Sequence, residues 1–216
     1  MLFPPVDQAD EDGLLAVGGD LSPQFLREAY SNGIFPWPVE GYPLLWFAPP
    51  QRAILFFDEL KINRRLGRTF RASNFQARFD TDFDSVIQAC AAPRHVDGEL
   101  ECGTWITPQM QAAYKNLHRS GDESFRARSV ETWQNDELVG GLYGVQIGQY
   151  FCGESMFHRA PDASKFALVA LVENLKSRGA SWLDVEMPTP HFTALGARQI
   201  ARPEFMQMLR ESQKRE

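Results

Sequence analysis

The stretch LVGGLYGVQIGQYFCGESM, from Leu138 to Met156, decides the fold of this 216-residue chain. Leu138 to Val145 and Gln149 to Met156 are predicted as strands. Immediately upstream, residues 129–133 alternate as a strand does, and Gln134-Asn135-Asp136 is typical of a turn. Strands joined by connections this short predict an antiparallel sheet.

Helical patterns lie on both sides of these strands. Thr107-Pro108 is typical of a helix start, and Gly121 is typical of a helix end. Asp162 is placed to cap a helix over about 163–178. Further elements are predicted at residues 82–91 (helix), 182–186 (strand) and 203 onward (helix). This order predicts an α+β fold with a central, mostly antiparallel sheet.

The first 50 residues have a different character, because they are rich in glycine and proline. Ser22-Pro23 predicts a helix that Gly33 ends, and the proline-rich segments after it are expected to form rigid loops. A strand is predicted at residues 53–57. We therefore expect a small N-terminal domain over residues 1–55 and a larger domain over residues 56–216.

Composition limits the classes of function. A net charge of −6 and a pI of about 5.3 argue against a protein that grips long nucleic acid over its whole surface, but not against one that holds only the end of a nucleic acid. No apolar run approaches the roughly 20 residues that span a membrane, and no signal peptide is recognised. Three cysteines and four histidines are widely scattered. We expect a cytoplasmic monomer without a membrane contact, a metal or a cofactor.

Two acidic stretches could carry chemistry. Gly153-Glu154-Ser155 is polar within an apolar strand, which fits either a buried site or an exposed strand end. In the predicted strand 182–186, Asp184 and Glu186 share one face because side chains alternate. Two carboxylates this close raise the pKa of one of them if they are buried. The alternative is a solvated strand face.

Basic and aromatic residues form two further candidate sites. The run from Lys61 to Phe79 contains six basic residues and no acid, which suits phosphate contacts but also fits a solvated helix. Trp37 lies in a proline-rich loop, and Trp105 precedes the helix predicted to start at Thr107. Each tryptophan could belong to the core or could form a platform for a ligand.

Seven motifs, in order from about residue 13 to about residue 200, resemble the leucyl/phenylalanyl-tRNA–protein transferase family. They are GLLAVGGDLSP, AYSNGIFPWP, LLWFAPPQRAIL, GTWIT, ELVGGLYGV, FCGESMF and ALGA. The resemblance implies a GNAT-like C-terminal domain and transfer of a leucyl, phenylalanyl or methionyl group from aminoacyl-tRNA. The implied acceptors are proteins with N-terminal Arg or Lys, which the transfer marks for N-degron degradation.

The resemblance also implies roles for individual residues. Glu154 matches an acid beside the aminoacyl ester, and Asp184 matches an acid that assists the attacking amine. Trp37 and Trp105 match tryptophans at the terminal adenosine of the tRNA. The walls of the aminoacyl pocket are matched by Leu142, Phe151, Met156, Leu171, Leu175 and Leu183. The residues matched to tRNA phosphates are Lys61, Arg64, Arg65, Arg68 and Arg71.

One departure from the family pattern is chemical. After the acid matching Asp184 the family typically has Cys-Gln, whereas this chain has Val185-Glu186. A carboxyl in place of an amide makes Glu186 a candidate catalytic residue and leaves open an altered choice of donor or acceptor. A GNAT-type N-acetyltransferase is the other alternative, although residues 159–164 lack the glycines expected of a pyrophosphate loop.

Overall fold

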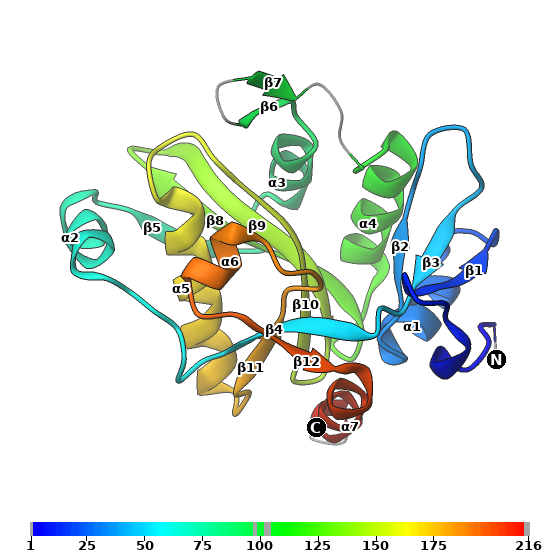
Figure 1. The fold of residues 1–216 in the computed structure, drawn as a ribbon. Coiled ribbons are helices and arrows are strands. Elements are labelled where there is room, and N and C mark those ends of the chain that lie inside the picture. The colour runs from blue at the N-terminus through cyan, green and yellow to red at the C-terminus, as the bar shows by residue number, and fades with distance from the viewer. Residues whose placement is uncertain (1, 97–98, 102–104, 214–216) are drawn as a thin grey trace.

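Two sheets of different size organise the chain, and the computed structural model describes residues 2–96, 99–101 and 105–213 (Figure 1). The smaller sheet has the order β1-β3-β2, and both of its pairings are antiparallel. Beside it lies helix α1, which Ser22 caps by accepting a hydrogen bond from the Phe25 N–H. The N-terminal elements are η1 (Val6–Gln8), β1 (Leu14–Val17), α1 (Pro23–Ser31), β2 (Phe35–Trp37) and β3 (Leu45–Phe47).

The larger sheet has seven strands in the order β12-β4-β11-β10-β9-β8-β5. Its pairings are antiparallel except for the one between β10 and β11, where Cys152 lies opposite Asp184. This topology confirms the predicted α+β class and the mostly antiparallel sheet. The strands are β4 (Gln51–Phe56), β5 (Gln76–Phe79), β8 (Arg126–Gln134), β9 (Glu137–Ile147), β10 (Tyr150–His158), β11 (Trp182–Asp184) and β12 (Arg198–Ala201).

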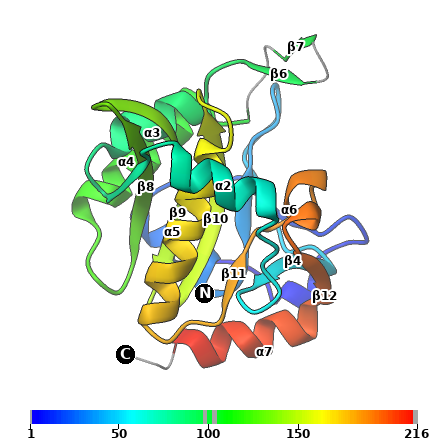
Figure 2. The same ribbon diagram turned by 90° about the vertical axis from the view of Figure 1, so that its left-hand side faces the viewer.

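Helices cover both faces of this sheet, and a short hairpin stands apart from it (Figures 1 and 2). Neighbouring residues of β9 show the division, because Leu142 belongs to the core cluster under α5 and Tyr143 to the cluster that contains α3 and α4 residues. The helices are α2 (Arg64–Ala72), α3 (Phe83–Cys90), α4 (Pro108–Ser120), α5 (Ala163–Ser177), α6 (Pro190–Ala194) and α7 (Arg202–Gln213); the hairpin is β6 (Arg94–Val96) with β7 (Glu99–Glu101).

Three local predictions differ from the structure. The strand predicted over 182–186 ends at Asp184, because Glu186 has a φ of +60° and turns the chain out of the extended conformation. Asp162 precedes α5, but its own φ is +65° and its carboxylate pairs with Lys165 instead of capping the helix. The boundary predicted after residue 55 falls inside β4, which belongs to the large sheet.

Among the described residues, no helix has the length and apolar character needed to cross a bilayer.

Candidate active site

Glu154 on β10 is the meeting point of two tyrosines from different helices. The hydroxyl of Tyr30, on α1, donates to Glu154 Oε1 at 2.5 Å, and the hydroxyl of Tyr114, on α4, donates to Oε2 at 3.3 Å. The two hydroxyls also contact each other. Burial raises the pKa of Glu154 to about 7, although the tyrosines and Arg52 oppose this rise. Glu154 is therefore a partly buried carboxyl that titrates near neutral pH.

A buried ion pair lies next to Glu154. Arg52, on β4, donates from Nε to Asp184 Oδ1 at 2.9 Å and from Nη2 to Asp184 Oδ2 at 2.8 Å. Both side chains are at most 1% exposed. Asp184 also accepts from the Tyr150 hydroxyl at 2.6 Å and from the Glu186 N–H at 2.8 Å. Because every one of these donors is in place, Asp184 is fully engaged by the protein.

The sheet register explains why these groups meet. β11 is only three residues long, and it lies between β4 and β10. In this register Asp184 pairs with Ile54 of β4 on one side and with Cys152 of β10 on the other. The charge on Arg52 is covered by the rings of Phe35 and Phe205, whose centroids lie 4.6 and 5.1 Å from Cζ.

Glu186 is buried as well, so the alternative of a solvated strand face is excluded. Its side chain is 8% exposed, its Oε1 accepts from Cys152 Sγ at 3.4 Å, and Arg52 Nη2 lies 3.9 Å from that oxygen. Burial raises the pKa of Glu186 well above its usual range, and the nearby charge of Glu154 raises it further. The raised pKa agrees with the prediction for the acidic pair, but Glu154 contributes more to it than Asp184 does.

One group of residues in the described chain has the spacing of metal ligands. A carboxylate oxygen of Glu154, one of Glu186 and Sγ of Cys152 lie within 4.8 Å of one another. Two features oppose a cation here. Arg52 is close to both Cys152 and Glu186, and burial raises the pKa of Cys152 well above its usual range, which disfavours the thiolate that a metal needs.

The six residues matched to an aminoacyl pocket lie together between the sheet and α5. They pack with one another as part of a single apolar cluster, and all except Met156 are buried. The structure therefore brings these residues together, but they form part of the packed core. Met156 is the partly buried member, and it lies two positions from Glu154 on the same strand.

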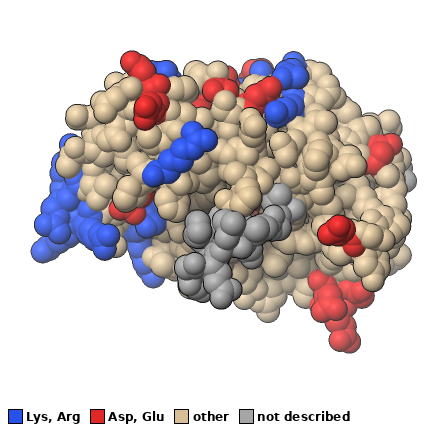
Figure 3. Space-filling model, turned by 90° about the horizontal axis from the view of Figure 1, so that it is seen from above, with Lys and Arg blue, Asp and Glu red and all other residues tan. Residues whose placement is uncertain are grey.

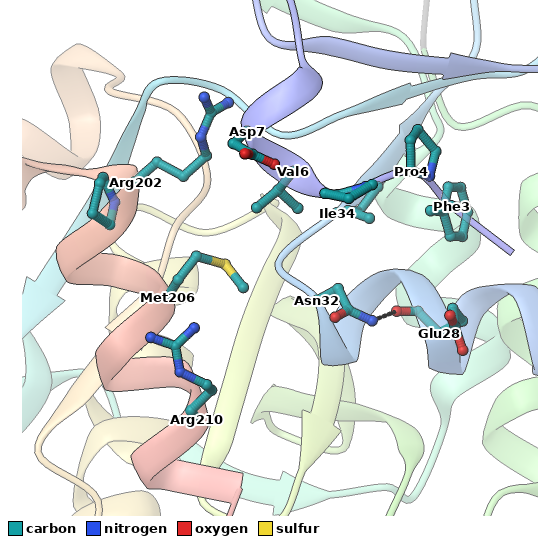
Figure 4. Close-up of a pocket in the computed structure, with 12 residues that line it drawn as sticks. Phe3, Pro4, Val6, Asp7, Glu28, Asn32, Ile34, Arg202, Met206 and Arg210 are labelled. Atoms are coloured by element: carbon teal, nitrogen blue, oxygen red, sulfur yellow. Dashed lines mark hydrogen bonds between the residues drawn. The ribbon is translucent and has the colours of Figure 1, made fainter. Parts of the chain in front are cut away.

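One cavity lies away from these residues. It has a volume of about 440 Å³, and its lining comes from the N-terminal segment, the end of α1 and α7 (Figure 4). Asn32, at the end of α1, donates to the Glu28 carbonyl, while Arg202, Met206 and Arg210 come from α7. None of the candidate site residues lines it.

The two candidate tryptophans are brought together by the fold. Trp37 ends β2 and Trp105 precedes α4, yet their rings stack with centroids 5.2 Å apart and an angle of 13° between the planes. Both side chains are partly buried. They form one two-ring platform, which joins the small sheet to the large domain.

The basic run forms an exposed helix. Arg64, Arg65, Arg68 and Arg71 are all exposed on or at the start of α2, and Lys61 is exposed just before it. None of the five forms an ion pair with another described residue. Figure 3 shows Lys and Arg side chains gathered at the end of the molecule that carries α2.

Several residues of this site were not predicted. Tyr30 and Arg52 each lie inside one of the quoted motifs, AYSNGIFPWP and LLWFAPPQRAIL, and that position was their signal in the sequence. Tyr114 was predicted only as part of the apolar face of its helix. The structure shows that its hydroxyl reaches Glu154.

Comparison with known protein families shows to which family the chain belongs. A family model described as leucyl/phenylalanyl-tRNA protein transferase matches residues 54–210, and a model for the N-terminal domain of that family matches residues 19–50. One match covers the N-terminal part of the fold and the other covers the part built on the large sheet. Together they define the class of the protein as a transferase. The chain belongs to the leucyl/phenylalanyl-tRNA–protein transferase family.

Named relatives support the family over nearly the whole chain. The leucyl/phenylalanyl-tRNA–protein transferase of Pseudomonas fluorescens strain Pf0-1 is 51% identical over 211 residues, which cover 97% of this chain and 90% of the relative. The enzyme of the same name from Nitrosomonas eutropha is 52% identical over 209 residues, covering 96% and 86%. The solved structure of L-PGS from Bacillus licheniformis is similar at 12% identity and a TM-score of 0.39, covering 80% of this chain and 55% of that one.

Proposed function

We propose that this protein transfers a leucyl or phenylalanyl group, and also a methionyl group, from its tRNA to the α-amino group of an acceptor protein. The observation that carries the proposal is the identity of about half of all positions to enzymes with this name, over nearly the full length of the chain. The acidic site supports it, because an acceptor with N-terminal Arg or Lys brings positive charge to Glu154 and Glu186. Such transfer would mark the acceptor for degradation.

The apolar cluster under α5 is the proposed site for the donor side chain. The matched residues of this cluster pack around β10, and Glu154 lies on the same strand. In the closed state they fill the space themselves, so a leucyl or phenylalanyl side chain enters only if Met156 and its neighbours shift. An apolar pocket of this kind separates side chains that differ by one methylene by only about 1–3 kcal/mol.

The tRNA is proposed to contact two separated surfaces. The stacked pair Trp37–Trp105 offers an aromatic face for the terminal adenosine, and the exposed arginines of α2 offer charge for phosphates. This division fits an acidic protein, because α2 and its approach gather five exposed basic residues that form no ion pair with another described residue. The contact with tRNA would then be local and sensitive to salt.

The reaction does not require a strong general base. An α-amine has a pKa of about 7.7–8.0, so removing its proton at neutral pH costs only about 1 kcal/mol. Holding the amine and the ester in attack geometry contributes roughly 7–11 kcal/mol. Glu154 is the carboxyl that titrates near 7 and has a partly exposed side chain, so we assign it contact with the amine. Asp184 has an indirect role: it accepts hydrogen bonds from Arg52 and from the Glu186 N–H, and so holds both groups in place.

The alternative of a GNAT-type N-acetyltransferase finds no support at the start of α5. Pyrophosphate would have to bind where the carboxylate of Asp162 already lies beside the first turn, paired with Lys165. The discriminating experiment offers the protein a panel of charged tRNAs and peptides that begin with Arg, Lys, Asp or Glu. Transfer of leucyl or phenylalanyl groups to the Arg and Lys peptides without a coenzyme is expected. Transfer of arginyl groups alone, or a need for acetyl-CoA, would overturn the proposal.

A further inference from the structure

The carboxyl groups of Glu154 and Glu186 form a close pair inside the protein. An oxygen of each lies within 4.8 Å of the other, although the residues come from β10 and from the turn after β11. Glu186 is 6% exposed and Glu154 is partly buried. Two negative charges at this separation repel strongly where little water screens them, so the pair is most stable with one proton.

The surrounding charges do not remove this repulsion. Arg52 is the nearby cation, but its Nε and Nη2 atoms are already bonded to Asp184, and only a longer contact of 3.9 Å reaches Glu186. The carboxylate of Asp184 on β11 adds a negative charge that raises the pKa values of both glutamates. The other groups that face the pair are the hydroxyls of Tyr30 on α1 and Tyr114 on α4, and the thiol of Cys152 on β10. These hydroxyls and the thiol are neutral at ordinary pH, because burial raises their pKa values well above the usual range.

The hydrogen bonds around Glu154 point to the same proton. Tyr30, Tyr114 and Glu154 make three mutual oxygen–oxygen contacts. When both tyrosines donate to an ionised Glu154, no proton remains for the contact between the two hydroxyls. A proton on Glu154 supplies it, because Glu154 then donates to one tyrosine, which can donate to the other. When Glu154 is ionised instead, the proton has a second place on Glu186, a few ångströms away.

We propose that Glu154 and Glu186 hold a single proton between them and that Glu186 keeps this proton during aminoacyl transfer, which leaves Glu154 ionised; the proposal rests on the function given above. Glu154 then takes one proton from the attacking amine as the nitrogen–carbonyl bond forms. It passes that proton to the ribose oxygen as the ester carbon–oxygen bond breaks. The pair ends with the one proton with which it began. Glu154 is the catalytic residue of the pair, and Glu186 is a positioning residue that controls its ionisation.

Glu186→Gln is the main test, because an amide imitates the protonated carboxyl at every pH. Rates are measured against pH with an aminoacyl-adenosine donor and an Arg peptide, and Glu173→Gln, on the exposed side of α5, is the control. We expect the variant to lose less than the roughly hundredfold that removal of an acid–base group costs. Its acidic limb should stay where the wild type has it, because Glu186 is neutral while Glu154 titrates, whereas the alkaline limb caused by loss of the shared proton from Glu186 should be absent. An alkaline limb that is the same in the variant and the wild type would overturn the pair.

A titration without substrate gives a second, independent readout. Carboxyl ¹³C NMR of glutamate-labelled protein is recorded for the wild type, Glu186→Gln and Glu154→Gln, with the fold checked by circular dichroism. Glu154→Gln should lower the titration midpoint of Glu186, because the charge that raises it is gone, whereas Glu186→Gln should leave the midpoint of Glu154 nearly unchanged. Transfer activity without the shift at Glu186 would overturn the pair alone. A shift at Glu186 without any aminoacyl transfer would overturn the proposed function and the proton route together.

Discussion

Trp37 and Trp105 stack face to face, 68 positions apart in the chain, with 5.2 Å between ring centroids. Because each ring holds the other in place, removing either should disturb the whole platform. Trp37→Ala and Trp105→Ala are each expected to raise the KM for an aminoacyl-adenosine donor by about tenfold, within the range of one lost base–aromatic contact. The double variant should be little worse than either single one. Tyr42→Ala, which removes a ring that is 70% exposed, is the control and should leave KM unchanged.

The arginines of α2 should act on tRNA through charge alone. Replacing Arg64 and Arg68 by glutamine is expected to weaken use of full tRNA and to reduce the slope of log KM against log salt by about 0.7–0.9 for each lost phosphate contact. Arg210→Gln, on exposed α7, is the matched control. The measurement is steady-state transfer over a range of salt. Equal losses with tRNA and with aminoacyl-adenosine would argue against a phosphate-binding helix.

Replacing only one partner of the Arg52–Asp184 ion pair should destabilise the folded protein. Asp184→Asn or Arg52→Met leaves a buried partner charge, and either is expected to lower the free energy of unfolding by about 3–5 kcal/mol. Removing the surface pair Arg198–Glu59, which is about half exposed, should cost about 1 kcal/mol or less. Denaturant unfolding measures both. Asp184→Asn should also slow transfer by about a hundredfold, and full activity in that variant would exclude a positioning role for Asp184.

Glu154 should make the protein less stable as the pH rises through the weakly acidic range. Its folded pKa of about 7 lies above the usual glutamate value of 4.5, so the folded state binds more protons between these values. The free energy of unfolding therefore falls as pH rises from about 4.5 to about 7, by an amount on the order of 3 kcal/mol. In Glu154→Gln the loss should be smaller by about this amount, with the part that the raised pKa of Glu186 contributes remaining, whereas Glu173→Gln should retain the whole loss. Identical stability curves for Glu154→Gln and the wild type would contradict the raised pKa.

Much of the fold follows from local patterns. The strands that became β8, β9 and β10 were predictable because apolar residues and turn residues alternate there over short distances. The helix that became α4 carries its start signal at Thr107 and its stop at Gly121, and both act as predicted. Such features depend on neighbours within a few positions, so one sequence suffices to show them.

The site depended on contacts that no local pattern contains. Arg52 meets Asp184 across 132 positions, and Tyr30 meets Glu154 across 124. The positive φ of Glu186 ends a strand that alternation alone would have continued, and it brings this carboxyl toward Glu154 instead of leaving it on an exposed face. These relationships need the sheet order and the register, which the sequence does not state.

The position of β4 has a consequence for the timing of synthesis. Its two neighbours in the sheet, β11 and β12, are among the last elements of the chain. At about 5–20 residues per second, a ribosome reaches Asp184 on the order of ten seconds after it has added Arg52. During that interval the guanidinium has no counter-ion and the edges of β4 are unpaired. The nascent chain therefore cannot modify other proteins until β11 and β12 have been synthesised.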